Sequence, residues 1–147
     1  MDENALLNLA LDVGEIMLTS GAETHRVEDT MERILSYNKK NTSEAFVTTT
    51  GLFVSINPDE KGSYSKLKRI QNRSVNLEKV SLANSISRDF VDGKITIDEA
   101  FEKINEIKAL PQKPWSTLLV CYTIVSCAFT FMFNGSIYDS ICSLIVG

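Results

Sequence analysis

Hydrophobic and polar positions follow a helical spacing in the first third of the chain. Apolar residues recur every three to four positions over residues 6–18 and again over residues 27–35, which predicts two amphipathic helices. The first ends at Gly21, a residue typical of helix ends, and Ser20 or Thr24 is expected to cap the second. The two helices therefore predict an αα-hairpin. Ala10 and Gly14 lie one turn apart on the apolar face, so a neighbouring element is expected to approach that backbone closely.

After Glu44 the composition shifts towards β-branched and aromatic residues. Three short runs, residues 45–50, 52–56 and 63–70, are separated by Gly51 and by an Asn-Pro pair, and together they predict an antiparallel meander of three strands. Lys66 and Lys68 fall on one face of the third run, so that face is expected to be basic and solvated.

A helical spacing returns at Asn76 and continues to Asp92–Gly93. Thr96 and Glu99 then form a capping-box pattern that predicts a last helix, closed by prolines at 111 and 114. The expected fold of residues 1–110 is therefore α+β, with two helices, a three-stranded antiparallel meander and two further helices.

The carboxy-terminal part has a different composition. Residues 115–133 carry no charged side chain, and a helix of that length rises about 1.5 Å per residue, close to the ~30 Å hydrocarbon thickness of a bilayer. A transmembrane helix is expected here, the alternative being a buried core helix of a soluble domain. A second apolar stretch begins at about residue 137 and is too short to span a bilayer. Residues 111–147 are thus predicted to be a membrane segment with a truncated second helix, and the chain to be a fragment.

The distribution of charge along the chain predicts which side of the membrane residues 1–110 lie on. The net charge is −4, and all fifteen Lys and Arg residues precede Pro114, whereas the segment after the apolar run carries only Asp139. Positive charge stays on the cytoplasmic side of membranes, so residues 1–110 are predicted to lie in the cytoplasm, at the cell membrane and next to its lipids. The charge pattern gives no indication of nucleic-acid binding.

The single histidine lies in the most polar helical segment. His25, Glu28, Asp29 and Glu32 fall within one helical sector, an arrangement that suits a cation or a carboxylate-tuned imidazole. The alternative is a solvated face on which Arg26 and Asp29 form ordinary surface pairs.

No metal site and no cofactor is expected from the remaining residues. The chain has no H-E-x-x-H pattern, and its three cysteines all lie in the apolar tail. The basic stretch from Lys61 to Arg73 has two open interpretations: it attracts anionic solutes, lipid headgroups or an acidic partner, or it keeps an edge strand soluble.

Four segments resemble a known family in sequence and in order. They are SGAETHRVEDTMERI, FVTTTGLFVSI, the region from Arg69 to Leu77, and LANSISRDFVDGKITIDEAFEKI, which look like the cytosolic domain of the threonine/serine exporter family. The resemblance covers nearly all of residues 1–110 and continues into the membrane helix. Thr49 stands where many relatives have proline, a departure that alters only the turn.

The resemblance implies an inner-membrane exporter of threonine, serine or related small carboxylates, whose soluble domain gates or assembles the transporter. It implies further membrane helices in this chain, in a partner subunit or in a homo-oligomer. A membrane-tethered hydrolase-like enzyme, using His25 with Glu28 or Glu32, is the alternative, although no nucleophile motif is evident. The resemblance and the polar segment together give the candidates for solute binding or coupling: Thr24, His25, Arg26, Glu28, Thr50, Arg73, Asn76 and Asn84.

Overall fold

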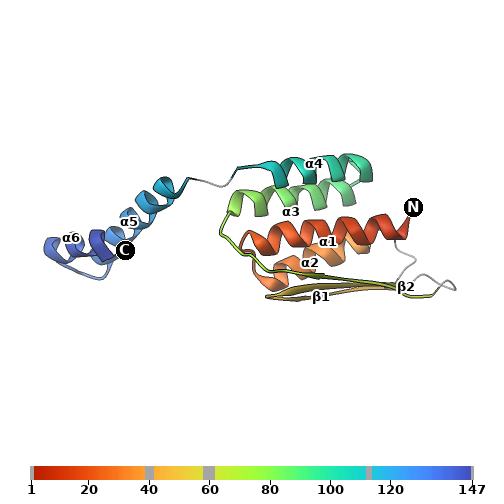
Figure 1. Ribbon diagram of the computed structural model, residues 1–147, viewed down its shortest axis with the longest axis horizontal. Helices are drawn as coiled ribbons and strands as arrows, with labels where there is room; N and C mark the ends of the chain where they lie inside the picture. The colour runs from red at the N-terminus through yellow and green to blue at the C-terminus, as the bar shows by residue number, and fades with distance from the viewer. Residues whose placement is uncertain (1, 39–41, 58–61, 112–113, 147) are drawn as a thin grey trace. The chain divides into compact units, whose positions relative to one another are not determined.

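The computed structural model describes residues 2–38, 42–57, 62–111 and 114–146. The chain divides into two compact units, residues 1–110 and residues 111–147, called here the amino-terminal unit and the carboxy-terminal unit. In the part of the chain that is described, the fold is α+β, with six helices and one three-stranded antiparallel sheet (Figure 1).

The amino-terminal unit is built in three layers. The sheet forms one outer layer, α1 and α2 form the middle layer, and α3 and α4 form the other outer layer (Figure 1). The elements are α1 Glu3–Thr19, α2 Thr24–Leu35, β1 Thr42–Thr48, β2 Gly51–Asn57, β3 Tyr64–Arg69, α3 Leu77–Val91 and α4 Ile97–Ala109. Their order confirms the predicted succession of two helices, three strands and two helices.

The sheet is the predicted meander, with strand order β1-β2-β3 and antiparallel pairing throughout. Phe46, Phe53 and Leu67 lie opposite one another on its outer face and are exposed. The inner face packs on α1 and α2, and register places Lys68 next to buried Leu52 there. The prediction that the lysine face of the third strand is simply solvated was therefore wrong: that face lies under a helix.

Helix α1 is the centre of the unit. It contacts α2, β2 and β3 as well as α3 and α4, because it lies between two layers, and ten of its residues are buried: Leu6, Leu7, Leu9, Ala10, Leu11, Val13, Gly14, Ile16, Met17 and Leu18. The sequence predicted one apolar face on this helix, whereas the structure buries residues on most of its circumference. What remains is a polar stripe along one side of the helix, formed by Asn8, Asp12, Glu15 and Thr19.

Helix ends follow the sequence signals with one exception. Gly21 has a positive φ of 90° after α1, and Thr96 forms the predicted capping box with Glu99 at the start of α4. The N-cap of α2 is Glu23, without a side-chain hydrogen bond. The prediction of Ser20 or Thr24 was wrong because Ser20 is the C-cap of α1 and Thr24 is already the first helical residue.

The carboxy-terminal unit consists of α5, Trp115–Met132, and α6, Ile137–Val146. Among the described residues, α5 is the one helix long and apolar enough to cross a membrane, with a mean hydropathy of 1.6 and none of its residues buried. Small polar side chains lie between the two helices: Ser126 Oγ donates to the Ser143 carbonyl at 3.3 Å, and Cys127 Sγ lies 3.4 Å from the Ser140 carbonyl. Such residues permit close helix packing in lipid.

Candidate functional site

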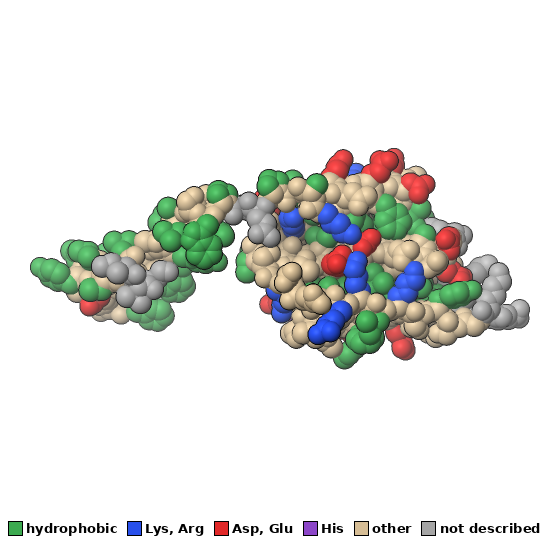
Figure 2. All heavy atoms as spheres, in the orientation of Figure 1, with side chains coloured by type: hydrophobic (Ala, Val, Ile, Leu, Met, Phe, Trp, Pro, Cys, Tyr) green, Lys and Arg blue, Asp and Glu red, His purple; other side chains and the backbone are tan. Residues whose placement is uncertain are grey.

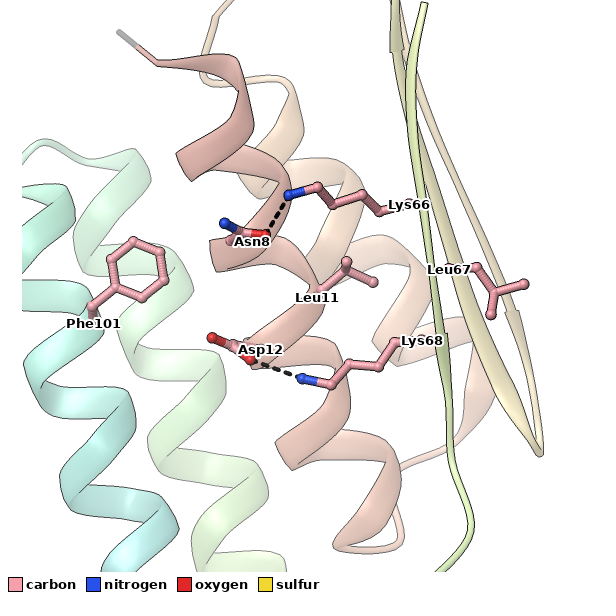
Figure 3. Close-up of a pocket in the computed structure, with 7 residues that line it drawn as sticks. All are labelled: Asn8, Leu11, Asp12, Lys66, Leu67, Lys68 and Phe101. Carbon is pink, nitrogen blue, oxygen red and sulfur yellow. Dashed lines mark hydrogen bonds and ion pairs between the residues drawn. The ribbon is translucent and has the colours of Figure 1, made fainter.

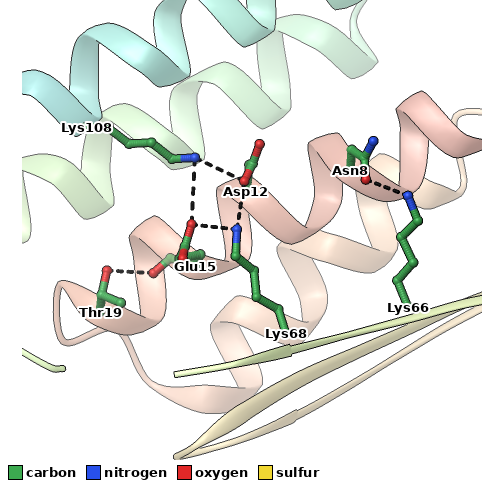
Figure 4. A network of polar contacts seen from close by, with 7 residues as sticks. All are labelled: Asn8, Asp12, Glu15, Thr19, Lys66, Lys68 and Lys108. Carbon is green, nitrogen blue, oxygen red and sulfur yellow. Dashed lines mark hydrogen bonds and ion pairs between the residues drawn. The ribbon is translucent and has the colours of Figure 1, made fainter. Parts of the chain in front are cut away.

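Four charged side chains from three elements meet over the polar stripe of α1 (Figure 4). Lys68 of β3 lies 3.0 Å from Asp12 and 2.8 Å from Glu15, measured between Nζ and the nearer carboxylate oxygen. Lys108, in the last turn of α4, lies 3.0 Å from Asp12 and 3.7 Å from Glu15. We call Asp12, Glu15, Lys68 and Lys108 the α1 charge cluster. On the face shown in Figure 2, basic and acidic side chains lie side by side in the middle of the amino-terminal unit.

The cluster is shielded enough to affect protonation. Burial alone would raise the pKa of the Asp12 carboxyl, but hydrogen bonds from Lys68 and Lys108 outweigh it and lower that pKa below its ordinary value. Burial likewise opposes the charge on Lys68, and the hydrogen bonds to Glu15 and Asp12 outweigh it and raise the pKa of the Lys68 ammonium. Both groups are therefore held in their charged forms at neutral pH.

Replacing Asp12 by asparagine should lower the free energy of unfolding at pH 7 by about 1–2 kcal/mol, between the values for exposed ion pairs and for hydrogen bonds to charged groups. Because the pKa of Asp12 is lower in the folded state, its contribution is present above about pH 4 and is lost as the pH falls further. The difference between wild type and Asp12→Asn should thus shrink towards pH 3.

Urea unfolding of the full chain in detergent micelles, followed by circular dichroism between pH 3 and 8, measures this difference. Lys94→Met is the matched control, because Lys94 pairs with Asp89 and Asp92 at an exposed site, and it should leave the profile nearly unchanged. A difference between wild type and Asp12→Asn that stays constant over the whole range would contradict the assignment.

A cavity of about 460 Å³ lies beside the cluster (Figure 3). Its polar lining comes from Asn8 and Asp12 of α1 and from Lys66 and Lys68 of β3, and its apolar lining from Leu11 and Phe101. Leu67 of β3 also borders the cavity, although its side chain points to the outer face of the sheet (Figure 3). The Lys66 ammonium donates to Asn8 Oδ1 at 2.7 Å. The cavity therefore combines two cations, one carboxylate and one amide with an aromatic side chain of α4.

The candidates on α2 lie at exposed and half-buried positions. The His25 side chain is 71% exposed, and its nearest carboxylate is Glu23 at 3.6 Å rather than Glu28 or Glu32. Arg26 is exposed, whereas Thr24 and Glu28 are half-buried. Within the described ranges, no group of three His, Cys, Asp or Glu residues could hold a metal ion.

The other candidates lie at turns and in α3. Arg73 Nε donates to the Leu18 carbonyl at 3.4 Å, and the Asn76 side chain caps α3. Thr50 lies in the turn between β1 and β2, and its carbonyl accepts from the Ile70 amide at 2.9 Å. Asn84 is half-buried within α3. The eight candidates are all described, no side-chain hydrogen bond or ion pair between two of them is found, and their role in binding stays a prediction.

Sequence reasoning missed Asn8, Asp12, Glu15 and Lys108. Lys68 and Asp12 are 56 positions apart, and Lys108 and Asp12 are 96 apart, so no local spacing connects them. One signal was present: polar residues at positions 8, 12, 15 and 19 share one side of an otherwise apolar helix, and charged or amide groups on a nearly buried helix require partners.

Comparison with known proteins gives one match. A family model described as "Putative threonine/serine exporter" matches residues 8–147. No curated protein and no solved structure matches the chain.

Proposed function

The chain belongs to the threonine/serine exporter family, and on this premise we propose that it exports small amino acids such as threonine and serine across the cell membrane. The observation that carries the proposal is the extent of the family match, which includes both units. Helix α5 supports it independently, since a helix of eighteen residues with no charged side chain and no buried residue is suited to lipid.

In this proposal, the amino-terminal unit lies in the cytoplasm and gates the transporter or assembles it with other membrane helices. Lys103 and Lys108 lie within about 15 residues of the start of α5, whereas the only charged residue beyond α5 is Asp139. This asymmetry favours a cytoplasmic amino-terminal unit because basic residues are retained on that side.

Deleting the gene for this chain should slow threonine and serine efflux from cells loaded with threonine- and serine-containing dipeptides. Intracellular free threonine should rise, since hydrolysis of the dipeptides continues while the exit route is lost. The measurement is the rate at which each amino acid appears in the medium. Restoring the wild-type gene is the control, and unchanged efflux of both amino acids after deletion would refute the proposal.

A further inference from the structure

The cavity beside the α1 charge cluster is lined by two polar atoms that make no hydrogen bond within the described part of the chain, one on half-buried Asp12 and one on exposed Asn8. Lys68 and Lys108 both bind Oδ1 of Asp12, and within the described part of the chain no hydrogen bond reaches Asp12 Oδ2. The second atom is Nδ2 of Asn8. The Lys66 ammonium can only donate, so the Asn8 atom that it contacts is Oδ1, and the other terminal atom of the amide is the donor Nδ2.

Figure 3 shows how these atoms lie. Asn8 Nδ2 and the second carboxylate oxygen of Asp12 are both directed to the side of α1 on which Phe101 lies, and all three residues line the same cavity. Asn8 and Asp12 are one helical turn apart, about 6 Å along the axis. The cavity thus presents a donor and an anionic acceptor at a fixed separation.

Positively charged side chains outnumber negatively charged ones near the cavity. Within the described ranges, Lys68 and Lys108 form ion pairs with two carboxylates, Asp12 and Glu15, whereas Lys66 donates to the neutral amide of Asn8 and contributes a further positive charge. A carboxylate would bind favourably beside Lys66 and Asn8 Nδ2, since charge-assisted hydrogen bonds are the stronger ones. A phosphate is less suitable, because its second charge would lie next to Asp12.

We propose that this cavity is a binding site for a small zwitterionic α-amino acid. Its carboxylate accepts from Lys66 and from Asn8 Nδ2, and its ammonium donates to Asp12 Oδ2. An α-amino acid carries both groups on one carbon, so hydrogen bonds of about 2.8 Å on each side span roughly one helical turn. The choice of threonine and serine as ligands rests on the proposed function, whereas the zwitterion requirement rests on the cavity.

The test is isothermal titration of the purified full chain in nanodiscs with L-threonine and L-serine. Threoninamide lacks the carboxylate and 3-hydroxybutyrate lacks the ammonium, and each should bind at least about tenfold more weakly than threonine, the loss expected for one hydrogen bond to a charged group. Equal binding of either analogue would overturn the proposal.

Two variants test the assigned residues. Lys66→Met removes the proposed carboxylate partner outside the α1 charge cluster, so it should weaken threonine binding about tenfold without a change in the urea midpoint. Asp12→Asn should weaken binding by a similar factor, but it also alters the cluster, so Lys66→Met decides between lost binding and lost folding. Lys94→Met, at an exposed ion pair, is the control and should bind threonine as the wild type does.

The proposed binding site and the proposed export function can be refuted independently of each other. If gene deletion abolishes efflux and the purified chain binds neither amino acid, the cavity assignment is wrong and the exporter function stands. If the chain binds threonine through Lys66 while deletion leaves efflux unchanged, the exporter function is wrong and the site stands.

Discussion

Replacing Gly14 by leucine should lower the free energy of unfolding of the amino-terminal unit by about 2–3 kcal/mol, in the range of overpacked cores. Gly14 lies in the middle of α1, where a β-carbon would collide with the side chain of Met31 in α2 and would lie 3.3 Å from Leu52 in β2. Both neighbours are fully buried, so neither can move into solvent. The better helix propensity of leucine, worth about 1 kcal/mol over glycine, does not offset this collision.

Urea-dependent pulse proteolysis of the full chain in detergent micelles measures the change. The control is a double-mutant cycle with Met31→Ala, which removes the side chain that the leucine would meet. Gly14→Leu should cost less in the Met31→Ala background than in the wild type, because contacting residues are not additive. Equal costs in the two backgrounds would show that the collision is not the cause.

Replacing Ile124 by arginine should release most of the chain from membranes. Ile124 is at the middle of α5 and is 62% exposed, and the hydrogen bonds from α5 to α6 come from Ser126 and Cys127 instead. An arginine at the centre of a membrane helix costs about 2.5–3.5 kcal/mol on insertion scales, while isoleucine is slightly favourable. The fraction of chain that resists carbonate extraction should therefore fall sharply, whereas Ile124→Leu should behave as the wild type.

The orientation of the amino-terminal unit can be measured by cysteine labelling in intact cells. All three cysteines lie in α5 and α6, so they can be replaced by alanine and a reporter introduced as Ser85→Cys at an exposed position of α3. A membrane-impermeant thiol reagent should label it only after the cells are permeabilised. Labelling in intact cells, or full membrane retention of Ile124→Arg, would contradict the placement of α5 and of the amino-terminal unit.

The succession of elements could be predicted from the sequence because its signals are local. The capping box of Thr96 and Glu99, the turn at Gly21 and the alternation in β2 each depend on residues only a few positions apart. The close approach at Gly14 was also predicted, since a glycine on the apolar face of a helix permits it. The three-layer arrangement was not, because the number of neighbours around α1 depends on how distant elements pack.

The charge cluster and the cavity depend on that packing. Lys68 was assigned to a solvated strand face because alternation separates the two faces of a strand but does not say which face a helix will cover. The sequence did not indicate that Lys108 pairs with α1, since lysine in the last turn of a helix is favoured by the helix dipole alone. His25 attracted attention as the one histidine, yet its side chain is largely exposed.

The position of Lys108 also has a mechanical consequence. It lies in the last turn of α4, just before the five residues that connect α4 to Trp115. Within the amino-terminal unit, buried Ile107 and the bond from Lys108 to Asp12 hold the last turn of α4 against peeling from its neighbours. Asp12 therefore anchors the end of α4 to the middle of α1.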